Sequence, residues 1–209
     1  MKLKKKVKII LILFIIVILA IFGYLLYQNI SNSKGTKEQK IVSEIKDYGY
    51  KLKDTKSKTY KEMFAELKKI LDSKNVNEEE YLKQISKMFI YDFYSLKDKA
   101  AKTDVGGTDF VYGEVLDNFL LNAQDTYYKY VESNIYNNRK QSLPVVDSSS
   151  IKISNIKEEE YAYGDKTDEK AYTVKVTWNY TSKEFSDYQK SATLVFIHDG
   201  KKLCLVELQ

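Results

Sequence analysis

Hydrophobic and polar positions follow three successive patterns along the chain, and the first is a continuous apolar run. Ile9 to Tyr27 contains no charged side chain. At ~1.5 Å rise per residue it would span ~28 Å as a helix, about the thickness of a bilayer core. The residues before it include five lysines: Lys2, Lys4, Lys5, Lys6 and Lys8. Lysines on this flank favour a cytoplasmic N-terminus, so the pattern predicts a single-pass membrane anchor with an extracytoplasmic C-terminal part.

A cleaved signal peptide is the alternative interpretation of this run. Signal peptides usually have a shorter apolar region followed by a small-x-small cleavage site. Neither Ala20–Tyr24 nor Ile30–Ser33 provides a convincing site of that kind. We therefore expect an uncleaved anchor that contacts membrane lipid through Ile9 to Tyr27.

The second pattern has apolar residues three and four positions apart, which is typical of amphipathic helices. The first such stripe runs from Tyr60 to Leu71 and the second from Tyr81 to Phe93. Asn77 precedes the second stripe as an expected N-cap, with three glutamates in the first turn. The third stripe runs from Leu116 to Val131 and predicts a helix of about four turns.

The third pattern is an alternation of period two, which begins at Ile151 and predicts antiparallel strands. Gly164-Asp165 and Asp199-Gly200 are turn signals between these strands. Residues 192–197 carry apolar side chains on both faces, as expected of a central strand. Helices followed by a meander of about four strands predict an α+β fold.

These patterns divide the chain into four parts. We expect a cytoplasmic basic tail (residues 1–8), the transmembrane anchor (9–27), a tether with an extended arm (28–58) and an extracytoplasmic α+β domain (59–209). Within the tether, Ile41 to Ile45 reads as a brief helical extension, and alternation around Tyr50 reads as a short strand.

Charge and cysteine content narrow the functional classes. The chain has 34 Lys+Arg and 29 Asp+Glu, and its net charge of +5 equals the five lysines of the tail, because no acidic residue precedes Glu38. The outer domain is therefore formally neutral, which argues against a nucleic-acid partner. The one cysteine, Cys204, excludes an intrachain disulfide.

The sequence offers no catalytic constellation, metal site or cofactor motif. His198 stands beside a hairpin turn and Cys204 within an apolar strand, so we expect structural roles for both. Glu78–Glu80 and Glu158–Glu160 lack the spaced ligands and central glycine of a calcium loop. Asp104–Gly107 lacks the preceding strand and the lysine of a phosphate loop, and it reads as a connection between helices.

The order of elements resembles the nuclear-transport-factor-2-like cone fold over residues 59–209. The resemblance rests on three helices followed by a curved antiparallel sheet, with an aromatic strand (Thr177–Tyr180) and a closing hairpin (Leu194–Leu203). It implies a cavity between helices and sheet, which enzymes such as ketosteroid isomerases line with tyrosines and a carboxylate or histidine. The corresponding candidates here are Tyr91, Asp92, Tyr94, Tyr127 and Trp178.

A membrane-anchored domain of this kind is similar to the assembly component of bacterial type IV secretion and conjugation machines. It is also similar to uncharacterised membrane proteins of low-GC Gram-positive bacteria. The expectation is a non-catalytic scaffold that binds envelope proteins or its own copies. The candidate contact residues are Tyr128, Tyr172 and Tyr188. The alternative is a small-ligand-binding or enzymatic cone with a tyrosine-lined cavity.

Overall fold

The computed structural model describes residues 17–18, 20–21, 24 and 40–209. The chain divides into two units, Met1–Glu38 and Gln39–Gln209. The predicted anchor, Ile9 to Tyr27, lies mostly outside the described residues, and its five described residues are helical. Among the described residues, no helix combines the length and apolar character needed to cross a membrane.

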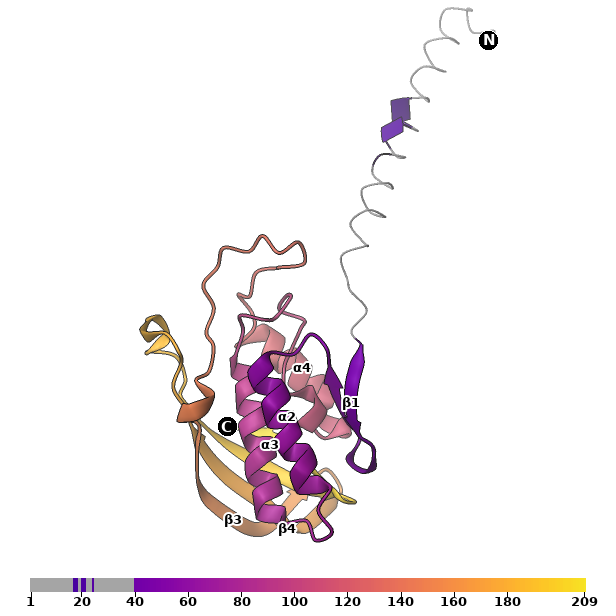
Figure 1. The fold of residues 1–209 in the computed structure, drawn as a ribbon, viewed down its shortest axis with the longest axis vertical. Coiled ribbons are helices and arrows are strands. Elements are labelled where there is room, and N and C mark those ends of the chain that lie inside the picture. Colours follow the sequence, from indigo (N-terminus) through magenta and orange to yellow (C-terminus); the bar gives the residue numbers. More distant parts are fainter. Residues whose placement is uncertain (1–16, 19, 22–23, 25–39) are drawn as a thin grey trace, which may run out of the picture. The chain divides into compact units, whose positions relative to one another are not determined.

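Residues 40–209 form an α+β fold, as the periodicity predicted. This part contains the helices α2 (Lys58–Leu71), α3 (Glu78–Tyr94) and α4 (Leu116–Asp125). Its main sheet is antiparallel, in the order β3 (Lys152–Tyr163), β4 (Lys166–Thr177), β5 (Ser191–Asp199) and β6 (Lys202–Leu208). The sheet curves behind α2 and α3 (Figure 1). Single 3-10 turns are η1 (Lys46–Tyr48), η2 (Thr108–Phe110), η3 (Gly113–Val115), η4 (Ser148–Ser150) and η5 (Lys183–Phe185).

Side-chain caps explain where α2 and α3 begin. The Ser57 hydroxyl accepts a hydrogen bond from the Tyr60 amide, and the Asn77 side chain accepts one from the Glu80 amide. The predicted N-cap at Asn77 is thus confirmed. The alternation in the second half is also confirmed, because β3 and β4 are joined at Gly164-Asp165 and β5 and β6 at Asp199-Gly200.

The third helix is shorter than its apolar spacing predicted. We expected it to continue to Val131, but α4 ends at Asp125, and the Thr126 backbone leaves the helical region at φ −116° and ψ −95°. Residues 126–130 are in turns. This change of direction buries Tyr128 completely, and its hydroxyl donates to the Phe93 carbonyl at 2.6 Å. Tertiary burial therefore overrides the local periodicity.

A hairpin precedes α2 and belongs to the same unit. β1 (Ile41–Ile45) pairs antiparallel with β2 (Tyr50–Lys53), so the expected helical extension at Ile41 to Ile45 is wrong. The β2 side chains alternate between buried and exposed, with Tyr50 and Leu52 buried. The unit accordingly begins at Gln39 rather than at residue 59, because the hairpin contributes to the core.

The core lies between the helices and one face of the sheet. From β5, Leu194 and Phe196 join this core, whereas Ile197 packs on the opposite face with Ala171 and Cys204. Burial on both faces explains why residues 192–197 carry apolar side chains on both faces of the strand. The strand predicted to be central is indeed flanked by β4 and β6.

Candidate functional site

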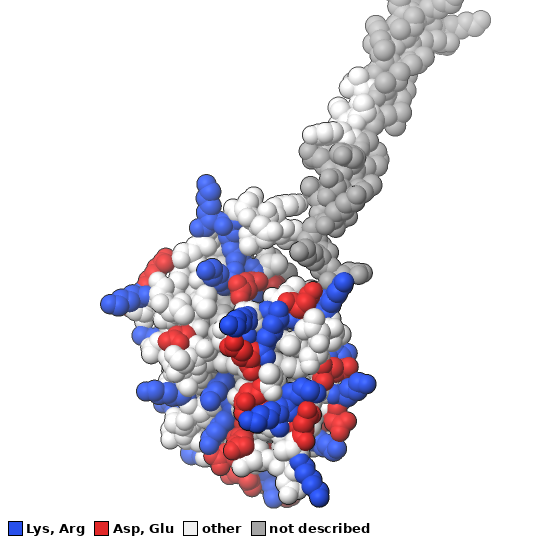
Figure 2. All heavy atoms as spheres, in the orientation of Figure 1, with Lys and Arg blue, Asp and Glu red and all other residues white. Residues whose placement is uncertain are grey.

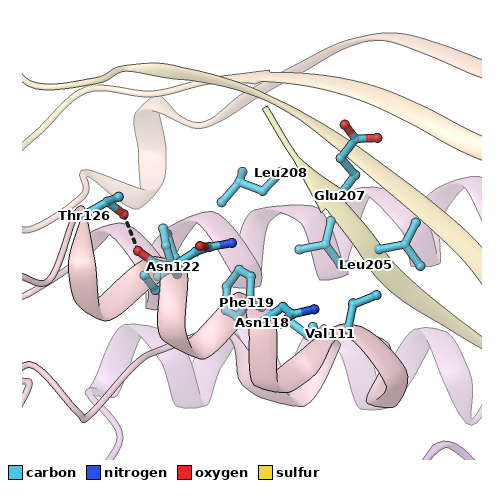
Figure 3. Close-up of a pocket in the computed structure, with 12 residues that line it drawn as sticks. Val111, Asn118, Phe119, Asn122, Thr126, Leu205, Glu207 and Leu208 are labelled. Carbon is cyan, nitrogen blue, oxygen red and sulfur yellow. Dashed lines mark hydrogen bonds between the residues drawn. The ribbon is translucent and has the colours of Figure 1, made fainter. Parts of the chain in front are cut away.

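An open pocket of about 420 Å³ lies between α4 and the edge strand β6 (Figure 3). It is lined by Phe93, Val111, Val115, Asn118, Phe119, Asn122, Ala123, Thr126, Leu205, Val206, Glu207 and Leu208. None of the five residues proposed for a cavity on sequence grounds is among them. We call this feature the α4–β6 groove.

The connection before α4 forms one end of the groove. Val111 makes a parallel bridge to Leu205, and the Tyr112 amide donates to the Leu205 carbonyl at 2.8 Å. The chain then turns through η3 into α4. This segment pairs with β6 only around Leu205, and the strand continues to Leu208 along the groove.

The groove has apolar walls with an amide-bearing rim. Figure 3 shows Asn118 and Asn122 on α4, with Leu205 and Leu208 on the β6 side. The Glu207 carboxylate points away from α4, and it accepts hydrogen bonds from the Tyr161 hydroxyl and the side-chain amide of Gln209. Apolar contact and hydrogen bonding by the asparagine amides are thus the chemistry that the groove offers.

The carboxylate of Asp92 lies outside the groove, in a buried ion cluster. Lys56 Nζ lies 2.6 Å from Oδ2 and Lys99 Nζ 2.8 Å from Oδ1. The Gly107 amide also donates to Oδ2, at 2.8 Å. The Asp92–Lys56–Lys99 cluster therefore joins α3 to two other segments. One precedes α2 and contains Lys56, and the other follows α3 and contains Lys99 and Gly107.

This environment sets the charge of Asp92. Burial by itself would raise the pKa of the carboxyl, but Lys99 and Lys56 outweigh it and hold the pKa well below its ordinary value. A carboxylate held so strongly in its charged form is a poor proton acceptor near neutral pH. The geometry around Asp92 is that of a structural ion cluster.

Three of the other proposed cavity residues, Tyr94, Tyr127 and Trp178, form one aromatic cluster. Tyr94 lies against Trp178 with ring centroids 4.3 Å apart and against Tyr127 at 5.0 Å. The Tyr127 hydroxyl donates to the Tyr94 carbonyl at 3.2 Å, and burial raises the pKa of Tyr127 above its ordinary value. Tyr91 stands apart from this cluster, with its hydroxyl 3.1 Å from the Ser57 hydroxyl.

The three tyrosines proposed as contact residues differ in exposure. Tyr128 is fully buried, so its assignment to a surface is wrong. Its hydroxyl is used internally, because it donates to the Phe93 carbonyl and accepts from the Gly106 amide. Tyr172 is half-buried on β4, whereas Tyr188 is exposed. Tyr188 thus remains available for contacts.

His198 is part of a charged bridge rather than an isolated loop residue. Its Nε2 lies 2.5 Å from the Glu78 carboxylate and its Nδ1 2.9 Å from that of Asp168. Burial by itself would lower the pKa of His198, but hydrogen bonds to Glu78 and Asp168 raise it. The bridge connects the start of α3 to strands β4 and β5.

Cys204, near His198 in the sequence, is buried, and burial raises the pKa of its thiol to about 11.

The charged side chains are interspersed on the face of residues 40–209 that Figure 2 shows. Lysine and arginine alternate there with aspartate and glutamate over short distances. Among the described residues, no group of three or more His, Cys, Asp or Glu is placed to hold a metal ion.

Comparison with other proteins adds no family assignment. No family model, no curated protein and no solved structure matches this chain. The geometry of the chain itself is therefore what supports a functional proposal.

The α4–β6 groove was missed by the sequence reasoning. Its two walls are separated by about 80 residues of chain, so no local pattern connects them. One signal was present: Asn118 and Asn122 lie one turn apart, on the flank of the helix beside its apolar stripe. A polar pair beside an apolar stripe marks a helix face that meets solvent next to the core.

Proposed function

We propose that this chain is a non-catalytic, membrane-anchored interaction domain on the outer face of a bacterial cell. One observation carries the non-catalytic part. Three of the aromatic side chains proposed for a catalytic cavity pack together around Tyr94 instead, and the one proposed carboxylate, Asp92, is paired with two lysines. A filled interior favours a module that acts through its surface.

The membrane location rests on the N-terminal sequence. The uncharged run Ile9 to Tyr27 has the length of a transmembrane helix, and the lysines before it favour a cytoplasmic N-terminus. Residues 40–209 carry 27 Lys+Arg and 28 Asp+Glu, so their charge is nearly balanced, and they would then face the outside. Partners in this location are envelope proteins or other copies of the chain.

The finer assignment is to the nuclear-transport-factor-2-like cone fold and to a role like that of the assembly component of type IV secretion machines. Three helices against a curved, four-stranded antiparallel sheet support the first part. The second part rests on the combination of such a domain with an anchor. Fold similarity by itself does not specify a function, so this part needs a direct test.

In-cell photo-crosslinking of the full-length chain tests the proposal. A benzoylphenylalanine placed at the exposed positions Tyr130 or Tyr188 should capture defined envelope proteins in living cells. The same residue at buried Tyr94 is the matched control and should capture none. The absence of any captured protein at both exposed positions would contradict an interaction domain.

The second candidate function is binding of a small apolar ligand, and the α4–β6 groove favours it. A volume of about 420 Å³ with mostly apolar walls lies in the range of ligand pockets. This candidate predicts saturable binding of a hydrophobic fluorescent probe by the full-length chain. Placing a tryptophan at Asn122 should abolish that binding.

A further inference from the structure

A long connection between α4 and β3 projects from one end of the folded unit. Its first part, residues 126–142, follows the last turn of α4 and contains no further helix or strand. In Figure 1 this connection extends past the ends of the helices. We call residues 126–142 the 126–142 loop. The loop is attached to the segment after α3, because the Asn134 amide donates to the Ala100 carbonyl at 2.7 Å.

One arginine fixes the conformation of this loop. The Arg139 guanidinium donates to the backbone carbonyls of Lys97, Lys99 and Glu132, at 2.6, 2.8 and 3.0 Å respectively. The Gln141 side chain adds a bond across the loop, because it accepts from the Glu132 amide at 3.0 Å. The two arms of the loop are therefore joined to each other and to the segment 97–104.

The ordered loop holds large apolar side chains in water. The Asn137 amide donates to the Asn134 carbonyl at 3.0 Å, which closes a turn with Ile135 and Tyr136 at its central positions. Ile135 is 49% exposed and Tyr136 60%, and Tyr130 on the preceding arm is 77% exposed. Such exposure buries little apolar surface, so it adds little to the stability of the fold. Adjacent exposed apolar side chains are typical of a contact site.

The loop lies at the end of the unit where the chain enters from its N-terminal side. Lys40 is hydrogen-bonded to the turn before α2, at 2.8 Å. Lys56, in the same turn, pairs with Asp92 near the end of α3. Lys99 pairs with the same carboxylate, and its carbonyl accepts from Arg139 of the loop. These contacts connect Lys40 to the loop through a few neighbouring segments.

The predicted anchor would keep this end close to a membrane. It ends at Tyr27, so 12 residues separate it from Lys40. At ~3.3–3.6 Å per residue, a chain of this length reaches at most ~40 Å. The loop is therefore within reach of the membrane surface wherever the anchor crosses.

Positive charge accompanies the apolar residues. The 126–142 loop and the segment 97–104 together contain six Lys or Arg and three Asp or Glu. The rest of residues 40–209 contains 21 Lys or Arg and 25 Asp or Glu. Four lysines of the two segments are exposed, namely Lys97, Lys102, Lys129 and Lys140. An anionic surface is the partner that this charge attracts.

We propose that the 126–142 loop binds the surface of the membrane that holds the chain. Ile135 and Tyr136 enter the boundary between headgroups and acyl chains, and Lys129 and Lys140 contact the phosphates of anionic lipids. Tyrosine suits this boundary because its ring is apolar and its hydroxyl can stay in water. The inference rests on the proposed membrane location and adds a second lipid contact to it.

The form of the loop argues for lipid over the other occupants. A lipid surface accepts a small convex turn without a matching cavity, and its binding strength grows with buried apolar area and with anionic charge. A protein partner would need a pocket shaped to the turn. A second copy of the chain would bring the exposed lysines of both loops together, which costs free energy.

The proposed contact predicts how the unit is oriented. α3 has 17 residues and is ~25 Å long at ~1.5 Å per residue. Asp92 marks its end near the loop, whereas Glu78 at its start is bridged to His198. With the loop on the membrane, we expect the end that contains His198 to face away from the bilayer.

Fluorescence quenching in vesicles tests the proposal on the full-length chain. The chain is reconstituted into phosphatidylcholine vesicles with and without phosphatidylglycerol, and an environment-sensitive dye is attached at Ile135→Cys. Quenching by lipids with a spin label on the acyl chain should be at least about twofold stronger there than at the control Glu160→Cys. Glu160 is exposed on β3, in the hairpin that contacts His198 through Asp168. Equal quenching at the two positions, or none at Ile135→Cys, would overturn the proposal.

Charge variants test the contact with anionic lipid. Lys129→Glu/Lys140→Glu should reduce quenching at Ile135→Cys about twofold in vesicles that contain phosphatidylglycerol. The matched control Lys170→Glu/Lys201→Glu makes the same change of charge at exposed positions near His198 and should leave quenching unchanged. Equal effects of the two double variants, or quenching that is independent of phosphatidylglycerol, would overturn the lysine contact.

An apolar variant tests the turn with a dye at another position. With the dye at Tyr130→Cys, Tyr136→Ser should weaken quenching, whereas Leu121→Ser should not, because Leu121 is an exposed residue of α4 outside the loop. All these positions are exposed, so circular dichroism should match among the variants. An equal loss from Tyr136→Ser and Leu121→Ser would overturn insertion of the turn.

The anchor and the loop can fail separately in this experiment. Flotation of the vesicles reports the anchor, and protein that floats without quenching at Ile135→Cys would overturn the loop contact and leave the anchor standing. Wild-type protein that does not float would overturn both.

The interaction function is also distinguished from the loop contact. In photo-crosslinking, we expect Tyr130 on the loop to capture lipid and Tyr188 to capture protein. Protein capture at Tyr130 in place of lipid would overturn the loop proposal and support the interaction domain. Lipid capture at Tyr130 without protein capture at either position would support the loop contact and contradict the interaction domain.

Discussion

Asp92 shows how much a single buried charge depends on its neighbours. Its carboxylate is satisfied by Lys56, Lys99 and the Gly107 amide, and both it and Lys99 are buried. Removing one member of such a cluster leaves the opposite charge buried without compensation. The importance of Asp92 therefore lies in the stability of α3 and its neighbouring segments.

We predict that Asp92→Ala lowers the free energy of unfolding by about 3–5 kcal/mol, because Lys99 would be left buried and unpaired. Urea denaturation followed by circular dichroism measures this loss. The matched control is Glu62→Ala, which breaks the exposed pair with Lys58 and should cost less than about 1 kcal/mol. Equal costs for the two variants would contradict the structural role of the cluster.

The bridge of His198 to Glu78 and Asp168 predicts a pH dependence of stability. Because these carboxylates raise the pKa of the folded imidazole, its contribution is complete below the unfolded pKa of about 6.5. That contribution is lost as the pH rises through the raised folded pKa. It should amount to less than about 1 kcal/mol, since the bridge is partly exposed and screened.

The measurement compares the free energy of unfolding of the wild type with that of His198→Gln between pH 5.5 and 9. We expect the wild type to be the more stable protein at low pH and the difference to shrink toward high pH. A difference that grows with pH would mean that the bridge does not favour the charged imidazole.

At the scale of elements, the loop around Gly106 and Gly107 illustrates how a connection packs on a helix. A Cβ added at Gly106 would lie 2.1 Å from the Asp92 carbonyl oxygen, and Gly107 has φ +75°. At position 106 glycine lets the loop backbone approach the backbone of α3 closely. At position 107 glycine adopts a positive φ, which other residues rarely do. This loop was correctly expected to connect helices, and its packing against α3 explains its composition.

We predict that Gly106→Ala lowers the free energy of unfolding by ~3 kcal/mol, because the loop would have to move away from α3. Gly113→Ala is the matched control, because an added Cβ there meets nothing within 4 Å and its φ is not positive. It should change stability by less than about 1 kcal/mol. Thermal unfolding of both variants distinguishes local crowding from a general effect of replacing glycine.

At the scale of the whole molecule, the charge pattern predicts an orientation in the membrane. Single cysteines provide the test, because native Cys204 is buried and the raised pKa of its thiol makes it a weak background nucleophile. A membrane-impermeant maleimide should label Glu160→Cys in intact cells, since Glu160 is exposed on β3. It should label Lys4→Cys only after permeabilisation.

Labelling of Lys4→Cys in intact cells would reverse the proposed orientation. Release of the labelled Glu160→Cys chain into the medium without the N-terminal run would instead support a cleaved signal peptide. Both outcomes are read on the full-length gene product by gel mobility and mass spectrometry. The experiment thus tests the anchor independently of any partner.

Much of the architecture was predictable from local pattern. The apolar stripe of α3, the cap at Asn77 and the turn at Asp199-Gly200 depend on residues only a few positions apart. Such short-range preferences can be read directly along a chain. Local pattern was misleading at Tyr128, which lies off the apolar stripe of the predicted helix and was therefore expected on the surface, but is buried beyond the end of α4.

The sequence by itself determined the α+β class, the order of helices before strands and the near neutrality of the part that follows the apolar run. Only the tertiary structure decided that Lys56 and Lys99 meet Asp92 and that α4 and β6 enclose a groove. The reason is physical: periodicity reflects which side of an element is buried, whereas ion pairs and pockets depend on which elements meet. Those contacts join residues far apart in the chain and exist only once the whole core has assembled.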